Sequence, residues 1–348
     1  MAELRRILEL WKRASAAGEE VCVATVAAVE GSSYRRPGAR MLMTAGGERA
    51  GTISGGCLEA EVAKKAWWLT ERGASVQRYS SFFDDDGDMP YGLGCGGAIQ
   101  VLLERGDPAR QALEALRRSV EERAAQVVVV NLGARPGTEL IVDASGREAW
   151  SRAASDAARA LAQKALREQA SQWEGDLFAE YMAPPPAVYI FGAGDDAQPL
   201  VQLTSELDWY VTVADGRSNL ARAQRFPQAA AVKPLVGALP EPGVRDAAVV
   251  MTHSYEQDRE ILRALLRREV RYLGVLGPRR RTEHLVCGIA PELGMTAEEC
   301  MAKLHAPVGL DLGAHAPGAI ALSIAAELQA VFGGAAARKN EPRAIVPA

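Results

Sequence analysis

Residues 188–197 read VYIFGAGDDA, and this stretch decides the fold of the second half of the chain. A short apolar segment leads directly into a G-x-G-x-x-A turn, and a helical pattern follows. Gly192 permits the sharp bend, Gly194 lets the backbone approach a pyrophosphate, and Ala197 allows close packing of helix on strand. The next predicted strand ends at Asp215, 21 positions after Gly194, where a ribose-binding carboxylate is expected. The spacing predicts a Rossmann fold.

Outward from this turn, strand-like and helical patterns alternate along the second half of the chain. Strands are predicted at residues 188–191, 210–214, 247–252 and 272–276. Helices are predicted at residues 199–207, 256–267, 279–287 and 318–331. Such alternation is typical of a parallel sheet with helices on both faces. We therefore expect a Rossmann-like, doubly wound α/β domain.

The charges around the turn leave its occupant open. Asp195 and Asp196 stand where the helix N-terminus would face phosphate, and their charge would repel an anion. Arg217 would instead favour a 2′-phosphate. Two interpretations follow: the domain binds NAD(P), or it keeps the turn for packing alone. The candidate nucleotide-binding residues are Gly192, Gly194, Asp215 and Arg217.

A proline-rich segment, APPPA at residues 183–187, marks the predicted domain boundary. Proline stiffens the chain and lacks a backbone donor. We predict a first domain over residues 1–183 and a second over residues 184–348. Strand-like and helical patterns mix irregularly in the first, which indicates an α+β domain. Its predicted helices are 2–16, 58–72, 108–122 and 152–173, and its predicted strands are 21–29, 40–44, 49–53, 76–83, 98–103, 127–132 and 139–142.

Three loops of the first half carry unusual chemistry. Ser54-Gly55-Gly56-Cys57 lies between a predicted strand and a predicted helix, where consecutive glycines can form a nest of N–H groups for an oxyanion. A cysteine at a helix N-terminus has a lowered pKa. A second loop, residues 94–97, places Cys95 among glycines, and a third, residues 31–38, is followed by Arg40. This third loop supplies hydroxyls and guanidinium groups that match a phosphate or a pterin edge.

Composition excludes several classes of protein. The chain has 348 residues, with 40 Lys and Arg against 44 Asp and Glu, so no general nucleic-acid binder is expected. No apolar stretch approaches the ~18–20 residues of a membrane span. Five cysteines, an odd number, argue against a disulfide scaffold and favour the cytoplasm. Neither loop cysteine has the close second Cys or His of a zinc site, so no metal site is predicted.

Together these segments resemble the XdhC/CoxI family, the accessory factors of xanthine dehydrogenase and related molybdenum hydroxylases. In the first half the resemblance rests on GSSYRRPGARMLM, GTISGGCLEAEV and GLGCGGAIQVLLE. In the second half it rests on VYIFGAGDDAQPL, VTVADGR, MTHSYEQD, YLGVLGPRRRTEHL and HAPVGLDLGAHAPGAIALSIAAEL. These segments follow one another in the order expected for the family.

The resemblance implies a protein that binds molybdenum cofactor, protects it, and helps its sulfurated form reach a xanthine dehydrogenase-type hydroxylase. It implies a cofactor-insertion chaperone more than a turnover enzyme, a homodimer, and a cysteine desulfurase as a candidate further partner. The loops of the XdhC/CoxI-type first domain fit this role, with Cys57 and Cys95 as candidate thiols. The candidate molybdopterin-binding residues are Ser32, Ser33, Arg36, Arg40, Ser54, Gly55, Gly56, Cys57, Cys95, Gly96 and Gly97.

Two other functions stay open from the sequence. One is an NAD(P)-dependent oxidoreductase that uses the second domain, and the other is a redox sensor that uses Cys57 and Cys95. Replacing Asp215 should cripple the oxidoreductase and spare the maturation factor, whereas replacing Cys57 should do the reverse.

Overall fold

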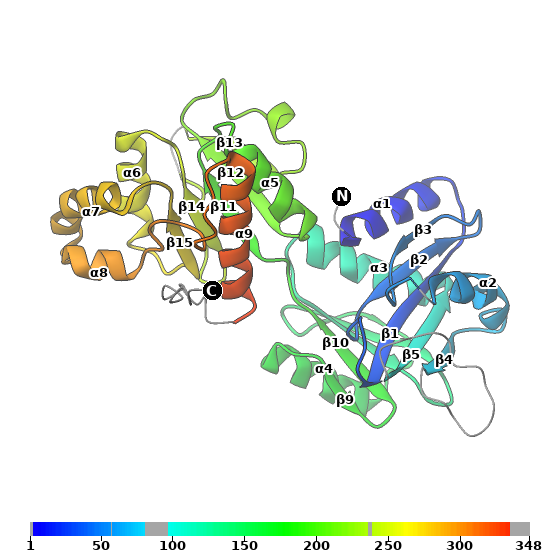
Figure 1. Cartoon of the computed structure of the whole chain (residues 1–348). Helices are drawn as coiled ribbons and strands as arrows, with labels where there is room; N and C mark the ends of the chain where they lie inside the picture. The colour runs from blue at the N-terminus through cyan, green and yellow to red at the C-terminus, as the bar shows by residue number, and fades with distance from the viewer. Residues whose placement is uncertain (1–2, 57, 81–96, 236–238, 335–348) are drawn as a thin grey trace, which may run out of the picture. The chain divides into compact units, whose positions relative to one another are not determined.

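The computed structural model describes residues 3–56, 58–80, 97–235 and 239–334. The chain forms two compact units, Glu3–Pro185 and Pro186–Ala348, and the division falls inside the proline-rich segment 183–187. Figure 1 shows the helices and strands of both units. Each unit has hydrophobic cores of its own, so each is described by itself.

The second unit is built on a parallel sheet with the strand order β13-β12-β11-β14-β15. Its strands are β11 (Ala187–Phe191), β12 (Tyr210–Asp215), β13 (Ala231–Pro234), β14 (Ala247–Val250) and β15 (Tyr272–Val275). An isolated bridge adds His305 beside Gly274, and the His305 N–H donates to the Leu273 carbonyl at 2.8 Å. From β11 the chain builds the sheet first in one direction, through β12 and β13, and then in the other, through β14 and β15. In such sheets ligands bind at the carboxyl ends of the strands where the direction changes, which here is beside β11 and β14.

Helices cover both faces of this sheet (Figure 1). The helices α5 (Ala197–Glu206) and α9 (Pro317–Phe332) share one core, in which Leu200 and Leu328 pack with Val213. The opposite core joins Ile261 and Leu285 to the sheet, and it belongs to α6 (Tyr255–Leu265), α7 (Arg279–Leu293) and α8 (Ala297–Ala302). A short 3-10 helix, η1, spans Ala223–Arg225. The predicted doubly wound Rossmann-like architecture is confirmed.

A buried carboxylate fastens the last helix to the sheet. Glu327 of α9 is fully buried, and its Oε1 lies 2.8 Å from His305 Nδ1. Its Oε2 accepts hydrogen bonds from the Tyr272 hydroxyl and from the Gly309 N–H. Burial and the Glu327 carboxylate raise the pKa of Tyr272 well above its ordinary value. Burial disfavours ionisation of Glu327, but its hydrogen bonds from His305 and Tyr272 outweigh burial and lower its pKa.

The first unit contains two antiparallel sheets. Sheet A has the order β3-β2-β1-β5-β4, and sheet B has the order β8-β7-β6-β10-β9. The strands of sheet A are β1 (Val21–Gly31), β2 (Arg40–Thr44), β3 (Arg49–Gly51), β4 (Ser75–Ser80) and β5 (Gly97–Arg105). Those of sheet B are β6 (Gln126–Asn131), β7 (Gly137–Asp143), β8 (Glu148–Ser151), β9 (Gln172–Glu174) and β10 (Leu177–Met182).

Four helices complete this unit, as the mixed α+β prediction requires. α2 (Glu59–Leu69) packs on one face of sheet A, and α4 (Asp156–Glu168) packs on one face of sheet B. α1 (Glu3–Ala16) and α3 (Gly106–Glu121) share a core with residues of both sheets. Each sheet therefore has one face against a single helix and the other against this common core.

The structure corrects the prediction of one helix over residues 152–173. α4 ends at Glu168 because Gln169 adopts the left-handed conformation of a C-cap, with φ 50° and ψ 38°. Two strands, β9 and β10, follow it. The sequence LFAEYM of β10 forms an antiparallel pair with β6, and five of its six side chains are buried. Packing in sheet B therefore overrides the helical tendency of this region.

Candidate functional site

The turn at residues 54–56 joins β3 to α2 and is organised by a carboxylate of the chain itself. The side chain of Glu59, at the start of α2, accepts hydrogen bonds from the N–H groups of Ile53 at 3.1 Å and Ser54 at 2.8 Å. The Ser54 hydroxyl donates to Glu59 Oε2 at 2.6 Å. It also accepts from the N–H groups of Gly56 and Leu58, each at 3.2 Å. Four N–H groups of this turn are therefore already paired within the chain.

The electrostatics of this turn follow from Glu59. Burial disfavours ionisation of the carboxylate, but hydrogen bonds from Ser54 and the backbone outweigh burial and lower its pKa. An ionised Glu59 occupies the role that a bound oxyanion would play in a nest of N–H groups. The sequence analysis missed Glu59, although a Ser followed five residues later by Glu across a strand-to-helix turn was visible in SGGCLE.

The structure places the 31–38 loop against both the 54–56 turn and Gly97, the one described residue of the 94–97 loop. A Cβ at Gly55 would lie 3.8 Å from two atoms of the Tyr34 ring, so the 31–38 loop lies against the 54–56 turn. A Cβ at Gly97 would lie 2.0 Å from the Ser32 carbonyl oxygen, so only glycine permits this approach of the two backbones. Gly97 and Gly31 are also directly paired between β5 and β1. Tyr34 itself is 76% exposed.

Three described side chains give the 31–38 loop its shape. Arg35 Nη2 donates to both carboxylate oxygens of Glu3 at 2.8 Å, and Glu3 Oε1 also accepts from the Thr52 N–H. The Ser33 hydroxyl donates to the Arg35 carbonyl at 2.9 Å. A surface hollow of about 400 Å³ lies beside this loop and is lined by Glu3, Tyr34, Arg35, Arg36 and Arg40. Arg36 and Ser32 are exposed on the loop.

Arg40 belongs to the interior of the unit. Its side chain is 5% exposed, Nη1 donates to Glu180 Oε1 at 2.9 Å, and Nη2 pairs with the other oxygen of the same carboxylate. This pair connects β2 of sheet A to β10 of sheet B. Removing one partner of such a pair leaves a buried charge uncompensated. In this conformation the guanidinium group serves the packing of the two sheets.

Some predicted site residues lie outside the described ranges. These are Cys57 and the pair Cys95 and Gly96. Their proposed roles therefore stay predictions. In the sequence, Cys57 follows Gly56 directly and Cys95 precedes Gly97 by two positions.

In the second unit, the Rossmann turn is shaped by close backbone contacts. Gly192 has a φ of +131°, and a Cβ there would lie 2.3 Å from the Met251 carbonyl oxygen. The nearest atom to a Cβ at Gly194 would be Asp196 Oδ1, at 2.5 Å, which is the end of a flexible side chain. The first glycine is therefore required by the packing of β11 against the end of β14.

The predicted ribose-binding carboxylate is fully engaged within the chain. Asp215 is completely buried, and its oxygens accept hydrogen bonds from the N–H groups of Ala193 at 2.7 Å and Arg217 at 2.8 Å. The Arg217 guanidinium adds two more, from Nε at 2.9 Å and from Nη2 at 2.7 Å. Burial opposes its ionisation, but the hydrogen bonds from Arg217 and Ala193 prevail and lower the pKa of Asp215. Two carboxylate oxygens offer about four acceptor positions, so this set is saturated.

The two other acids of the turn are also paired. Asp195 lies 2.6 Å from Arg225 Nη2, and Asp196 Oδ2 lies 2.7 Å from His253 Nε2. His253 has a φ of +61°, a conformation that is strained for a side chain other than glycine. The negative charge that the sequence places here is partly neutralised by Arg225.

Within the described ranges, no group of three or more His, Cys, Asp or Glu side chains is arranged to hold a metal ion. In the same part of the chain, no helix has both the length and the apolar character needed to cross a bilayer.

The fold and these loops define a protein of two units: in chain order, an α+β unit rich in glycine turns and then a Rossmann unit. A family model described as the XdhC Rossmann domain matches residues 188–328, and one described as the XdhC and CoxI family matches residues 14–80. The chain belongs to the XdhC and CoxI family, as its resemblance predicted.

Named relatives agree with this membership. The chain is 32% identical over 321 residues to a probable xanthine dehydrogenase subunit of Bacillus subtilis, with 89% of this chain and 92% of that protein covered. It is 25% identical over 328 residues to the molybdenum cofactor insertion chaperone PaoD of Escherichia coli, with coverages of 94% and 88%. A crystal structure described as a xanthine dehydrogenase from Bacillus halodurans covers 98% of both chains, with 29% identity and a TM-score of 0.77.

Proposed function

We propose that this chain is a maturation factor that binds molybdenum cofactor as cargo on its first unit and passes it to a xanthine dehydrogenase-type hydroxylase. The observation that carries the proposal is that the 31–38 loop contacts both the 54–56 turn and Gly97, with Tyr34 against Gly55 and Ser32 against Gly97. The relative named as a molybdenum cofactor insertion chaperone supports the same role.

The described side chains offer groups that suit molybdopterin. The exposed Tyr34 ring provides a face for stacking a flat pterin. Arg36 is exposed beside it and provides a cation for the phosphate or for a pterin carbonyl. Glu59 and the Ser54 hydroxyl already accept hydrogen bonds from four N–H groups of this turn, so we assign the phosphate to the arginine side of the site and not to that turn. Arg40 is assigned a positioning role through Glu180.

The thiols complete the proposed site. A soft metal centre accepts thiolate ligands. In the sequence, Cys57 directly follows Gly56, and Cys95 stands two positions before Gly97. We propose that at least one of these thiols approaches molybdenum while the cofactor is held. The sulfurated form of the cofactor, a cysteine desulfurase as sulfur source, a homodimeric state and a cytoplasmic location belong to the same proposal.

The test is pterin content. The full chain would be purified without oxygen from a host that makes molybdopterin, and the released pterin would be oxidised to its fluorescent form and quantified per chain. We expect near-stoichiometric pterin, which Tyr34→Ala and Arg36→Ala reduce severalfold and which Cys57→Ser or Cys95→Ser removes. Arg280→Ala, an exposed arginine of the second unit, is the matched control and should retain it. Pterin-free wild-type protein, or variants that retain full pterin, would overturn the proposal.

The alternative of an NAD(P)-dependent oxidoreductase gains no support from the geometry of the second unit. That function expects Asp215 to bind a ribose diol, and all four acceptor positions of its carboxylate are engaged.

A further inference from the structure

One carboxylate of the first unit links the 31–38 loop to the segment that leads into the 54–56 turn. It belongs to Glu3, in the first turn of α1. Arg35 Nη2, from the 31–38 loop, lies 2.8 Å from both of its oxygens. The Thr52 N–H and the Thr52 hydroxyl donate to Oε1 at 2.8 Å and 3.0 Å. Three donor groups from two separate segments therefore meet on this one side chain.

Thr52 connects Glu3 to the 54–56 turn through the backbone. The two residues that directly follow Thr52 donate their N–H groups to Glu59. Three consecutive N–H groups are therefore held by two carboxylates, the first by Glu3 and the next two by Glu59. The position of Glu3 consequently affects where this turn begins.

Helix α1 gives the Glu3 side chain a fixed base. Ile7, Leu8 and Leu10 of this helix are buried in the core that both sheets share. A Cβ at Gly51, the last residue of β3, would lie 2.6 Å from Ile7 Cδ1 and 2.3 Å from the Arg40 carbonyl oxygen. Only glycine permits so close an approach of α1 to the end of β3. The carboxylate therefore extends from a firmly packed helix.

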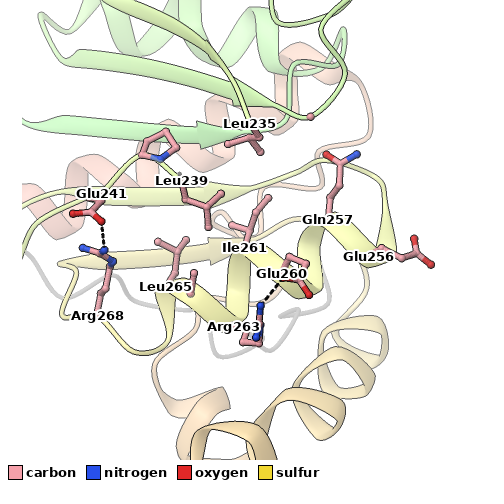
Figure 2. Close-up of a pocket in the computed structure, with 13 residues that line it drawn as sticks. Leu235, Leu239, Glu241, Glu256, Gln257, Glu260, Ile261, Arg263, Leu265 and Arg268 are labelled. Atoms are coloured by element: carbon pink, nitrogen blue, oxygen red, sulfur yellow. Dashed lines mark hydrogen bonds and ion pairs between the residues drawn. The ribbon is translucent and has the colours of Figure 1, made fainter. Parts of the chain in front are cut away.

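The surroundings of Glu3 distinguish it from an ordinary surface ion pair. The side chains of Glu3 and Arg35 are 23% and 25% exposed. Figure 2 shows an ordinary pair beside a cavity of the second unit, Glu260 with Arg263 at 2.7 Å, whose side chains are 57% and 42% exposed. Such exposed pairs contribute little, because water and salt screen them. A partly buried carboxylate that also accepts a backbone N–H contributes more.

Glu3 also borders the place that we assign to the cargo. The hollow of about 400 Å³ beside the 31–38 loop has Glu3, Tyr34 and Arg36 in its lining. Tyr34 and Arg36 are the groups proposed for the pterin ring and its phosphate. Arg35 stands between them in the sequence and is held by Glu3. Loss of this contact would misplace both groups, and small misplacements of binding groups have large effects.

We propose that Glu3 is a positioning residue, which holds the 31–38 loop and the segment before the 54–56 turn at a fixed separation, so that both contact one cargo molecule. It acts through Arg35 and Thr52. The inference rests on the proposed function of the first unit and adds the residue that couples the two parts of its site.

A simpler role for Glu3 would be to stabilise α1. An acidic side chain in the first turn interacts favourably with the helix dipole, and aspartate does so as well as glutamate. The aspartate side chain is one methylene shorter, so from the same helix it would not reach Arg35 and Thr52 together. Glu3→Asp therefore separates the positioning role from the helix-stabilising role.

The first experiment is hydrogen exchange of the full chain without cargo, monitored by mass spectrometry. Glu3→Asp should raise exchange about 3- to 30-fold in the 31–38 loop and in residues 49–54, while α1 stays protected. Arg35→Met should raise exchange in the loop alone, because Glu3 still accepts the Thr52 N–H. Glu9→Asp, at an exposed acid of the same helix, is the matched control and should change neither segment. Equal exchange in Glu3→Asp and Glu9→Asp would overturn the proposal.

The second experiment measures the release of pterin from protein purified without oxygen. Glu3→Asp should release it about 3- to 30-fold faster than wild type. Glu260→Asp, in the exposed pair of Figure 2, should release it at the wild-type rate. Wild-type release by Glu3→Asp would overturn the proposal. Wild-type protein without pterin would instead overturn the proposed function, and the exchange experiment would still decide whether Glu3 holds both segments.

Discussion

The two glycine turns of this chain look alike in sequence and differ in what surrounds them. Each joins a strand to a helix, and in each a carboxylate accepts backbone N–H groups: Glu59 in the first unit and Asp215 in the second. The Asp215 carboxylate is balanced by a guanidinium that grips both of its oxygens. The contacts described for Glu59 come from Ser54 and the backbone.

That difference separates two uses of a glycine turn. The turn of the second unit is rigid because its first glycine has backbone packed against it at 2.3 Å. In the turn of the first unit, a Cβ at Gly56 would meet no atom of the described residues within 4 Å, and the N–H groups of the turn are held by the Glu59 carboxylate and the Ser54 hydroxyl. A glycine motif therefore indicates a sharp turn, and its neighbours decide whether the turn receives an anion.

The largest effect is expected from Gly192→Ala. The new Cβ would collide with the Met251 carbonyl, and a φ of +131° is strained for alanine. The second unit should lose about 4 kcal/mol or more of its free energy of unfolding. Hydrogen exchange monitored by mass spectrometry would report the loss of protection in β11 and β14.

Gly194→Ala is the matched control, since the nearest atom to its Cβ would be the end of the Asp196 side chain, which can rotate. If Gly194→Ala lowered the free energy of unfolding as much as Gly192→Ala does, backbone packing against Gly192 would not explain the destabilisation.

Glu59→Ala should have the next largest effect. It leaves the N–H groups of Ile53 and Ser54 and the Ser54 hydroxyl without their acceptor in a buried turn. We expect the free energy of unfolding of the first unit to fall by about 2–3 kcal/mol. Chemical denaturation would measure this change, and hydrogen exchange in α2 would report it locally. Glu61→Ala removes an acid from the same helix that forms an exposed ion pair with Lys65, and it should cost far less. If the two variants lost equal free energy of unfolding, the hydrogen bonds of Glu59 would not be what stabilises this turn.

Gly56→Ala should lower the free energy of unfolding of the first unit by about 1–2 kcal/mol. Its φ of +110° strains any residue with a Cβ, but no atom in the described part of the chain lies within 4 Å of the added methyl group. The same denaturation measurement would check it. A loss as large as that of Gly192→Ala would mean that the two turns are equally confined, contrary to the comparison.

The smallest effect concerns pH. The pKa of Glu59 is lowered in the folded chain, so its stabilising contribution is present above the unfolded pKa of about 4.3. That contribution is lost as pH falls through the lower folded value. Glu59→Gln should therefore flatten the dependence of first-unit stability on pH below about pH 5. Identical slopes for wild type and Glu59→Gln, measured by hydrogen exchange in α2, would contradict this assignment.

The sequence predicted the second unit better than the first for a physical reason. Parallel strands buried on both faces are short apolar runs between amphipathic helices, and VYIF and YVTVA stand out as such. The strand β13 escaped prediction because AVKP is short and partly polar. In the first unit, β9 and β10 follow an alanine-rich helix, and they become strands because β10 pairs with β6 and β9 pairs with β10.

The site was predictable only in part. The three loops were visible as glycine clusters, whereas the approach of the 31–38 loop to Gly97 depends on the pairing of β1 with β5. The pairing of Arg40 with Glu180 had no local signal, because the two residues are 140 positions apart. The N–H groups of the SGG turn were expected to face a ligand, and the structure gives four of the turn's N–H groups partners within the chain.

The buried Glu327 has a consequence for how the protein is made. It holds the Tyr272 hydroxyl, the His305 ring and the Gly309 N–H, all of which are synthesised before it. During translation these three groups lack their hydrogen-bond partner until α9 has emerged from the ribosome. The first unit ends at Pro185 and can fold while the remainder is still being added. A chain that ends before residue 327 therefore has a complete first unit, and a second unit without the Glu327 hydrogen bonds that hold α9 to the sheet.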